Sequence, residues 1–386
     1  MFLPCLSGLA VQRFGERPVL LMTLLSIVAG QLVFCLSVQT RVVTGMILGR
    51  VLVGIGGETM GVLGSEITTR WFQDKQLSFA LALNLGGSRL GSVANSMLVP
   101  GWTEASGVVS ASWMGTVLPL GVTLLSCLYL LRLSDVAGPE ASSNPPGFIS
   151  SVSRFNRIYW QLGIVCVLGY GGINTFTNSA QRFLAAWFYK GDQRAAGSAT
   201  SIPYILSGIL VPPVGFLLDL PWFRSPPRSL VLSHILMVAA HLMFLFKIGP
   251  ILPLIFLGTA YALYGVAFWA GLARCLCDLS VPTGSGNTSI SGIEHHDPYG
   301  TLHSSDHVPR PSNNEEEHSV KSTEEEAVDK GLITLGYGIM TSLLNLTTAL
   351  VPVLLAGTEN AAGFSGPEMV FLALAAVGCI ASARLA

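Results

Sequence analysis

Long apolar stretches, separated by short polar ones, run along the whole chain. Ten of them hold roughly 18 to 25 residues, and a helix of that length crosses the hydrocarbon core of a bilayer, which is about 30 Å thick. The pattern therefore predicts ten transmembrane helices, at residues 19–38, 43–66, 77–100, 113–132, 158–180, 197–219, 229–247, 251–273, 331–356 and 367–384.

Two longer polar segments interrupt this series. Residues 133–157 contain Gly138-Pro139 and a second Pro-Gly-rich turn, which is typical of a linker. The linker separates an N-terminal helical bundle at 1–132 from a C-terminal bundle at 158–386. Residues 279–330 are rich in His and Glu, and we predict that they form a disordered loop inside the second bundle.

The composition strengthens the membrane interpretation. Hydrophobic residues make up 51% of the chain and charged residues 11%, with a mean hydropathy of +0.58. Soluble domains carry about 25% charged residues, so this chain is too apolar to bury its surface in one water-soluble core. The net charge is −1 and no basic stripe occurs, which excludes a nucleic-acid partner and leaves the lipid bilayer.

Lys and Arg are shared unequally between the two sides of the predicted bundle. With residues 12–18 placed in the cytosol, that side carries fourteen of them and the opposite side four. Cytosolic loops of membrane proteins carry such an excess. The pattern thus places the 279–330 loop in the cytosol.

A motif containing glycine and arginine opens the chain and recurs in shorter form in its second half. Residues 8–20 read GLAVQRFGERPVL, and residues 215–219 read GFLLD. The glycines permit close helix contact and a tight turn, while the arginines stay in the cytosol. Both motifs resemble the loop signature of the major facilitator superfamily, although Gln12 replaces the usual acid. We expect conformational roles for Gly8, Arg13, Gly15, Arg17, Gly215 and Asp219.

The resemblance implies an all-α polytopic membrane protein with two bundles of six helices. On that template, residues 1–11 are the end of helix two. Helix one and most of helix two are then expected upstream of Met1. Helix one lines the substrate cavity in this superfamily, so part of the site is expected outside this sequence.

A glycine-rich face and one acid stand out in the span that begins at residue 43. Arg50, Gly54, Gly57 and Gly61 recur on one side of the helix, and small residues at such spacing favour tight packing against a neighbouring helix. Arg50 and Gly54 also resemble the helix-four signature of the superfamily. Glu58 lies near mid-span, where a carboxylate is costly unless it is paired or faces water. We interpret it as a site residue, with a structural salt bridge to an arginine as the alternative.

The next span carries an arginine near its middle. Arg89 lies between Gly87 and Gly91, whose small-xxx-small spacing favours close approach of a partner helix. A guanidinium at that depth is suited to hold a carboxylate in a water-filled cavity. Together with Glu58 it offers one negative and one positive pole, as a zwitterionic substrate requires.

Several uncharged polar and aromatic residues complete the candidate substrate-binding set. They occupy four of the predicted spans, and the aromatic ones are open to either a cavity role or plain packing. His234 and His241 share one helix face and are interpreted as packing or an interhelical hydrogen bond. The candidates are Asn84, Asn95, Tyr170, Asn174, Tyr261, Trp269 and Asn345.

At these positions the resemblance narrows to the lysosomal dipeptide transporters of the superfamily. It rests on residues 49–59 (GRVLVGIGGET), 88–95 (SRLGSVAN) and 335–346 (LGYGIMTSLLNL). This resemblance implies that Glu58 and Arg89 receive the amino and carboxyl ends of a dipeptide. It also implies a lysosomal or vacuolar membrane, alternating access as a uniporter, and a glycosylated single-span accessory subunit.

Other classes of function lack their motifs. No Walker loop, no Gly-x-Ser-x-Gly elbow and no metal-spaced His/Cys set occurs, so we expect no enzyme, no metal and no cofactor. Two further hypotheses stay open beside dipeptide transport. One is a proton-coupled carrier of another organic anion; the other is a non-transporting membrane scaffold or sensor.

Overall fold

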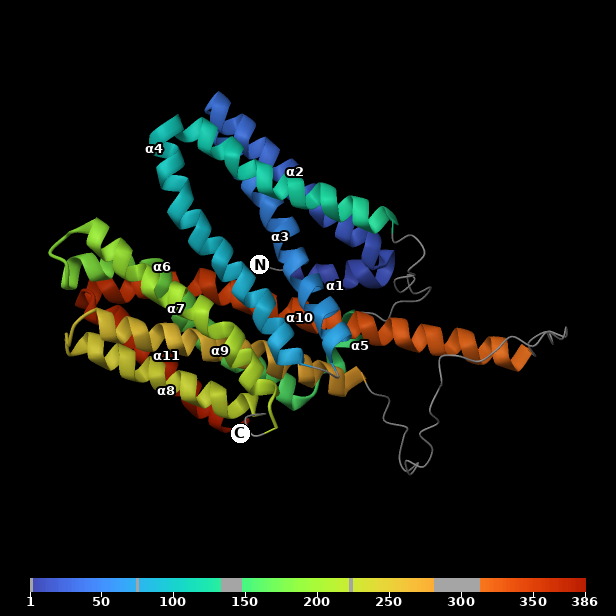
Figure 1. The fold of residues 1–386 in the computed structure, drawn as a ribbon. Helices are drawn as coiled ribbons and strands as arrows, with labels where there is room; N and C mark the ends of the chain where they lie inside the picture. Colours follow the sequence, from blue (N-terminus) through green and yellow to red (C-terminus); the bar gives the residue numbers. More distant parts are fainter. Residues whose placement is uncertain (1–2, 74–75, 133–147, 222–224, 281–312) are drawn as a thin grey trace.

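The computed structural model describes residues 3–73, 76–132, 148–221, 225–280 and 313–386. Every regular element in these ranges is a helix (Figure 1). The helices are α1 (Leu3–Phe14), α2 (Glu16–Thr40), α3 (Val43–Phe72), α4 (Leu77–Arg132), α5 (Phe148–Ser153), α6 (Arg157–Trp187), α7 (Gln193–Asp219), α8 (Pro226–Leu245), α9 (Ile251–Ser280), α10 (Asn313–Ala362) and α11 (Ser365–Ala383).

All ten predicted spans are helical. Helix α4 contains two of them and turns at Gly107, whose φ of 83° lies in the left-handed region that glycine tolerates. In the described part of the chain, eight helical stretches are long and apolar enough to cross a membrane. The predicted spans 77–100 and 158–180, in α4 and α6, are not among these eight.

The prediction of a disordered loop over 279–330 was wrong for part of that segment. Helix α9 extends to Ser280, and α10 already begins at Asn313, so residues 313–330 are helical. Residues 281–312 lie outside the described part, as do residues 133–147 of the predicted linker. The segment 313–330 is rich in Glu, which favours helix, and it continues the long helix that follows.

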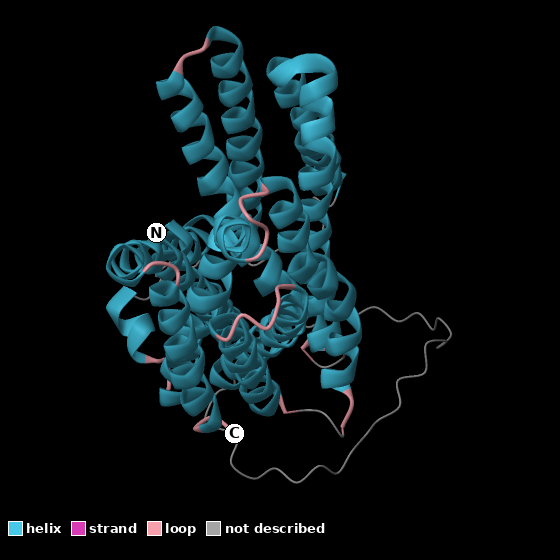
Figure 2. Ribbon diagram, turned by 90° about the vertical axis from the view of Figure 1, so that its left-hand side faces the viewer, coloured by secondary structure: helices cyan, strands magenta, loops and turns pink. Residues whose placement is uncertain are grey.

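The helices form two groups that meet at one end. Helices α1–α4 make the N-terminal group and α6–α11 the C-terminal group (Figure 1). The groups touch where α1 packs on α10 and where α4 packs on α7 and α9. From there they diverge toward the α2–α3 and α6–α7 turns, and Figure 2 shows the upper helices projecting from the lower bundle.

Glycines of the repeated motif lie at both crossings between the groups. A Cβ atom on Gly8 would come within 2.7 Å of the Leu335 backbone in α10. One on Gly215 would come within 2.8 Å of the Ser78 carbonyl oxygen in α4. The close helix contact expected of these glycines is therefore confirmed, and Gly15 has the φ of 80° that the turn between α1 and α2 requires.

The glycine face predicted on α3 was wrong in its register. Gly54, Gly57 and Gly61 would meet no atom within 4 Å if each carried a Cβ. The close contact with α2 is made instead by Gly49 and Gly56, where an added Cβ would lie 2.6 Å from backbone atoms of α2. Glycines lie on several sides of this helix, and only tertiary packing decides which of those sides meets a neighbouring helix.

The small-xxx-small prediction on α4 failed in the same way. An added Cβ at Gly87 or Gly91 would meet nothing within 4 Å. Gly86, one position earlier, is buried and faces Pro212 of α7 at 3.7 Å. This open side of α4 is not the side that carries Arg89, since two residues correspond to about 200° of helix rotation.

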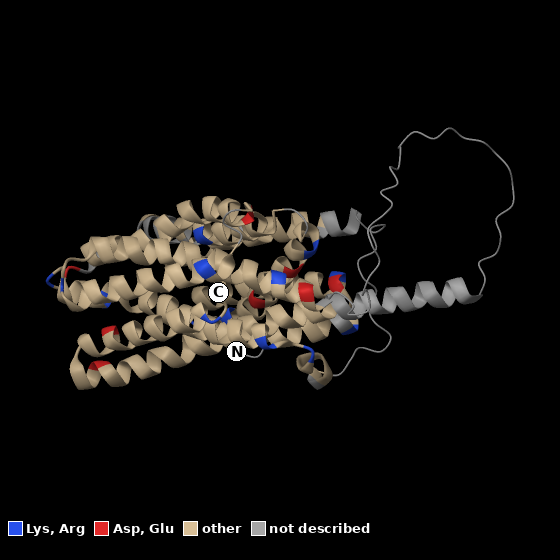
Figure 3. Cartoon of the chain, turned by 90° about the horizontal axis from the view of Figure 1, so that it is seen from below, with Lys and Arg blue, Asp and Glu red and all other residues tan. Residues whose placement is uncertain are grey.

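Buried aromatic side chains concentrate in the C-terminal group. Tyr159, Tyr264, Phe268 and Tyr337 are almost fully buried there, within one continuous apolar cluster. Along most of their length the helices carry neither acidic nor basic side chains (Figure 3). Exposed Leu, Ile and Val are numerous on the outer helix faces, as expected for surfaces that lie in hydrocarbon.

Candidate functional site

A cavity of about 270 Å³ lies between the two helix groups. Helices α3 and α4 form one wall, and α9 and α10 contribute the other. The acid predicted as a site residue lies in the wall, beside two of the open glycines. The lining is Gly57, Glu58, Gly61, Ser65, Leu81, Asn84, Leu85, Ser88, Trp269 and Thr341.

Glu58 is held from the opposite bundle. The side-chain amide of Asn345 in α10 donates a hydrogen bond to the Glu58 carboxylate at 2.8 Å. Both residues are half-buried. This bond satisfies one carboxylate oxygen and leaves acceptor capacity on the cavity side, because a carboxylate offers about four lone-pair positions.

Arg89 faces an aromatic ring instead of an acid. Its guanidinium lies 3.5 Å from the centre of the Tyr261 ring in α9, a cation–π contact between the bundles. The Nε atom is buried and has no hydrogen-bond partner in the described part of the chain. Glu58 and Arg89 therefore do not form the salt bridge that was the alternative. Each of them has a neutral partner from the other bundle.

Tyr261 links Arg89 to another predicted residue. Its hydroxyl donates a hydrogen bond to the Oδ1 atom of Asn174 in α6, at 3.3 Å. The Tyr204 ring of α7 stands edge-on to Tyr261, with the ring centres 6.4 Å apart. Tyr261 is 4% exposed and is not one of the residues that line the cavity, so of the two alternatives left open for it the structure favours packing.

Trp269 borders the Glu58 cavity and connects it to the aromatic core. Its ring stacks on Tyr337 of α10 at 6.0 Å, and its centre lies 6.4 Å from that of the buried Tyr170. Tyr170 stands edge-on to Tyr264 and Phe268. These rings fix the wall of the cavity, and Tyr170 belongs to the packed layer behind Trp269.

The other predicted residues lie at several different places. Asn84 is exposed and lines the cavity, whereas the side chain of Asn95 lies outside the described residues. Arg50 is exposed with its guanidinium 4.0 Å from the centre of the Phe34 ring, and Gly54 lies in open space. Arg13 is exposed and Arg17 is half-buried near the α1–α2 turn.

Polar contacts join the two bundles at their closed end. The two carboxylate oxygens of Asp219 accept hydrogen bonds from the backbone N–H groups of Ser78 and Phe79, at 3.0 and 2.8 Å. These groups open α4, where no intrahelical acceptor exists, so Asp219 acts as the cap of a helix in the other bundle. Arg274 lies 3.6 Å from Asp219 and donates to the Ser78 hydroxyl at 2.9 Å.

Sequence reasoning missed two sets of contacts at this closed end. Arg274 reads in the sequence as a flanking residue, and its contacts with Asp219 and Ser78 come from distant segments. The hydroxyls of Thr69 and Tyr337, in α3 and α10, lie 2.6 Å apart. No local sequence pattern predicts that pair, since 268 positions separate the two residues.

The arrangement matches that of a known family of transporters. The sequence model of the Major Facilitator Superfamily matches residues 1–285, about three quarters of the chain. This chain belongs to the major facilitator superfamily. It is therefore a multi-pass membrane transporter and not an enzyme.

Within the superfamily, curated relatives agree with the narrower resemblance. The chain is 26% identical to the lysosomal dipeptide transporter MFSD1 of Gallus gallus over 277 residues, which covers 67% of this chain and 61% of that protein. It is 28% identical to MFSD1 of Danio rerio over 305 residues, covering 73% and 64%. The chain thus spans about three fifths of the length of these relatives.

Solved superfamily structures share the fold. The outward conformation of FucP aligns with a TM-score of 0.68 at 14% identity, over 100% of this chain and 86% of that one. The human organic anion transporter MFSD10 aligns with a TM-score of 0.68 at 15% identity, over 99% and 80%. At such identities the likeness shows the major facilitator fold alone.

Proposed function

We propose that this transporter moves dipeptides or related zwitterionic solutes across a lysosomal or vacuolar membrane. The supporting observation is that its two mid-span charges do not neutralise each other. Glu58 accepts from Asn345, and Arg89 lies on the Tyr261 ring with a buried, unbonded Nε. Charges at this depth are costly, and an ionic ligand with both signs would satisfy both of them.

The chemistry of each charged side chain indicates which end of the substrate it binds. The guanidinium of Arg89 has the planar fork that matches a carboxylate in a bidentate pair. Glu58 accepts hydrogen bonds only, which suits an ammonium group. Asn345 already donates to Glu58, so a bound amine shares or replaces a bond that joins the two bundles.

Alternating access is supported by how the bundles touch. At the closed end they meet through glycine contacts and the Asp219 cap, and mid-span they meet through Asn345 and Tyr261. Such separate contacts suit rocking of one bundle against the other around a central site. Uniport and the accessory subunit remain predictions that follow from the resemblance.

The test is uptake of a labelled dipeptide by proteoliposomes that contain the full-length protein. We expect Glu58→Gln and Arg89→Gln each to abolish uptake, and the double variant to transport no better than either. Arg228→Gln, an exposed arginine in the first turn of α8, is the matched control and should transport normally. Near-normal uptake by the double variant would show that the two charges only balance each other.

An N-acetylated dipeptide separates this proposal from transport of an organic anion. Acetylation removes the ammonium group and keeps the carboxylate. If Glu58 receives the amino end, the acetylated peptide should not compete with the labelled dipeptide. Competition at equal concentration would favour the anion carrier.

A further inference from the structure

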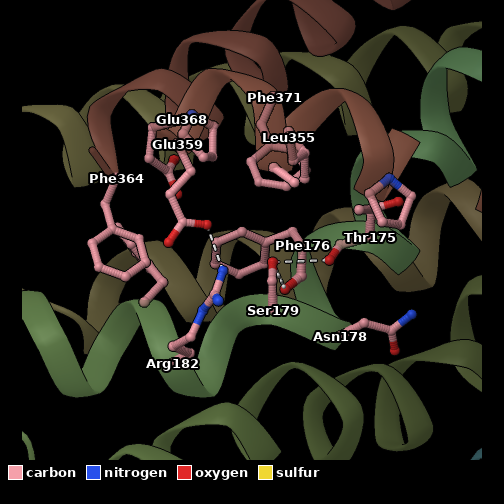
Figure 4. Close-up of a pocket in the computed structure, with 14 residues that line it drawn as sticks. Thr175, Phe176, Asn178, Ser179, Arg182, Leu355, Glu359, Phe364, Glu368 and Phe371 are labelled. Carbon is pink, nitrogen blue, oxygen red and sulfur yellow. Dashed lines mark hydrogen bonds and ion pairs between the residues drawn. The ribbon is translucent and has the colours of Figure 1, made fainter. Parts of the chain in front are cut away.

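A second pocket lies inside the C-terminal bundle, away from the cavity between the bundles. It has a volume of about 210 Å³ and is enclosed by α6, α10 and α11 (Figure 4). None of its lining residues borders the Glu58 cavity. Its walls include the rings of Phe176, Phe183, Phe364 and Phe371.

A carboxylate is buried in the wall of this pocket. Glu368, in the first turn of α11, has 1% of its surface exposed and accepts a hydrogen bond from Nδ1 of His241 in α8, 2.8 Å from its Oε2 atom. The N-terminus of α11 stabilises negative charge at that position. Phe371 stacks on the His241 ring, which fixes the imidazole behind the carboxylate.

An unsatisfied hydroxyl borders the same space. Thr175 of α6 is 2% exposed and lines the pocket, and its Oγ1 atom has no hydrogen-bond partner in the described part of the chain. A buried hydroxyl without a partner is costly. Its neighbour along the pocket, Ser179, already donates to backbone carbonyls.

An ion pair stands at the outer edge of the pocket. Arg182 of α6 bonds to Glu359 of α10, and their side chains are 67% and 25% exposed (Figure 4). That pair is neutral as a whole. The remaining titratable groups that face the pocket are Glu368 and the imidazole behind it, which lie within hydrogen-bond distance of each other.

We propose that this pocket binds a small organic cation, an ammonium group attached to an apolar body, independently of the transport site. The ammonium group donates to Glu368 and to Thr175, and the phenylalanine rings contact the apolar body and add cation–π attraction. A dry cavity of about 150 Å³ accommodates a benzene ring. The volume of about 210 Å³ therefore suits one ring with a short amine.

The experiment titrates benzylamine into the purified full-length protein in nanodiscs and measures heat of binding. Benzyl alcohol, which has the same ring and no charge, is the matched ligand. We expect benzylamine to bind and benzyl alcohol to bind at least tenfold more weakly, because a hydrogen bond to a charged group is worth about tenfold or more in affinity. Equal affinities would overturn the proposal.

Single substitutions test whether benzylamine binds in this pocket. Glu368→Gln should weaken benzylamine binding about tenfold or more, and Thr175→Val, which preserves shape, about threefold or more. Thr177→Val is the matched control on α6, since that hydroxyl already bonds to backbone carbonyls. Glu58→Gln, in the central cavity, should leave binding unchanged.

Folding of each variant is checked by thermal unfolding, and Thr175→Val decides the result if Glu368→Gln does not fold. Binding that is lost in Glu58→Gln and kept in Thr175→Val would place benzylamine in the transport cavity. Binding that is unchanged in both Thr175→Val and Glu368→Gln would remove the pocket as a site.

Discussion

Arg89 shows how an apolar helix carries a charge without an acid beside it. Its guanidinium lies on the Tyr261 ring at 3.5 Å, and Tyr261 is itself held by Asn174. The ring compensates part of the desolvation cost of the guanidinium and leaves its N–H donors for a ligand. The residue that carries the charge and the residue that supports it lie on different bundles.

The fork geometry of Arg89 gives a prediction at this scale. Arg89→Lys keeps the positive charge but loses bidentate pairing and the planar stack on Tyr261, so dipeptide affinity should fall about tenfold. Arg89→Ala should abolish binding. Equilibrium binding of a labelled dipeptide to the purified protein measures both, and wild-type affinity in Arg89→Lys would contradict bidentate binding.

Among the helices, α3 has two different faces that are both formed by glycines. Gly49 and Gly56 pack against α2, and Gly57 and Gly61 line the cavity. The first pair is needed for close approach of two backbones. The second pair keeps side chains out of a space that a substrate must enter.

A matched pair of alanine variants tests this division. Gly49→Ala places a Cβ 2.6 Å from the Phe34 backbone nitrogen, so α2 and α3 must separate, at a cost of about 1–3 kcal/mol. Gly57→Ala meets no atom within 4 Å and should leave stability unchanged or raise it by up to about 1 kcal/mol. Thermal unfolding in detergent measures both, and equal unfolding midpoints would refute the assignment.

The cap on α4 supplies a second prediction for the elements. Asp219→Ala removes two hydrogen bonds to the start of α4 and the partner of Arg274, which should destabilise the closed end by about 1–3 kcal/mol. Asp219→Asn keeps one acceptor oxygen and should have a smaller effect. The readout is the rate at which a thiol reagent modifies a cysteine placed at Phe79, which should rise most in Asp219→Ala.

For the molecule as a whole, the closed end lies on the same side as the carboxyl end of α9. Helix α9 ends at Ser280, and Arg274, six residues earlier, contacts the Asp219 cap. The excess of Lys and Arg predicts that this side is cytosolic. The cavity that contains Glu58 would then open toward the lumen in this conformation.

Limited proteolysis tests that orientation. Glu294 is the one glutamate in segment 281–312, so a protease that cuts after glutamate, added to sealed vesicles with the cytosolic face outward, should cut there. Glu294→Gln, the control, should lose that cut. Protection of Glu294 until the vesicles are opened with detergent would reverse the topology.

Apolar length in the sequence was enough to determine the ten helical spans, because each membrane helix satisfies its own backbone and needs little from its neighbours. The superfamily followed from the resemblance of the motifs at residues 8–20 and 215–219. The positions of Glu58 and Asn345 also follow from the sequence as candidates. Their pairing does not, since 287 positions separate them and packing of two bundles brings them together. For the same reason only the tertiary structure decided which glycines of α3 meet α2, that Arg89 rests on Tyr261, and that Glu368 and Thr175 border a second pocket. Local pattern fixes a helix, whereas the neighbour of each helix face depends on how all the faces are packed at once.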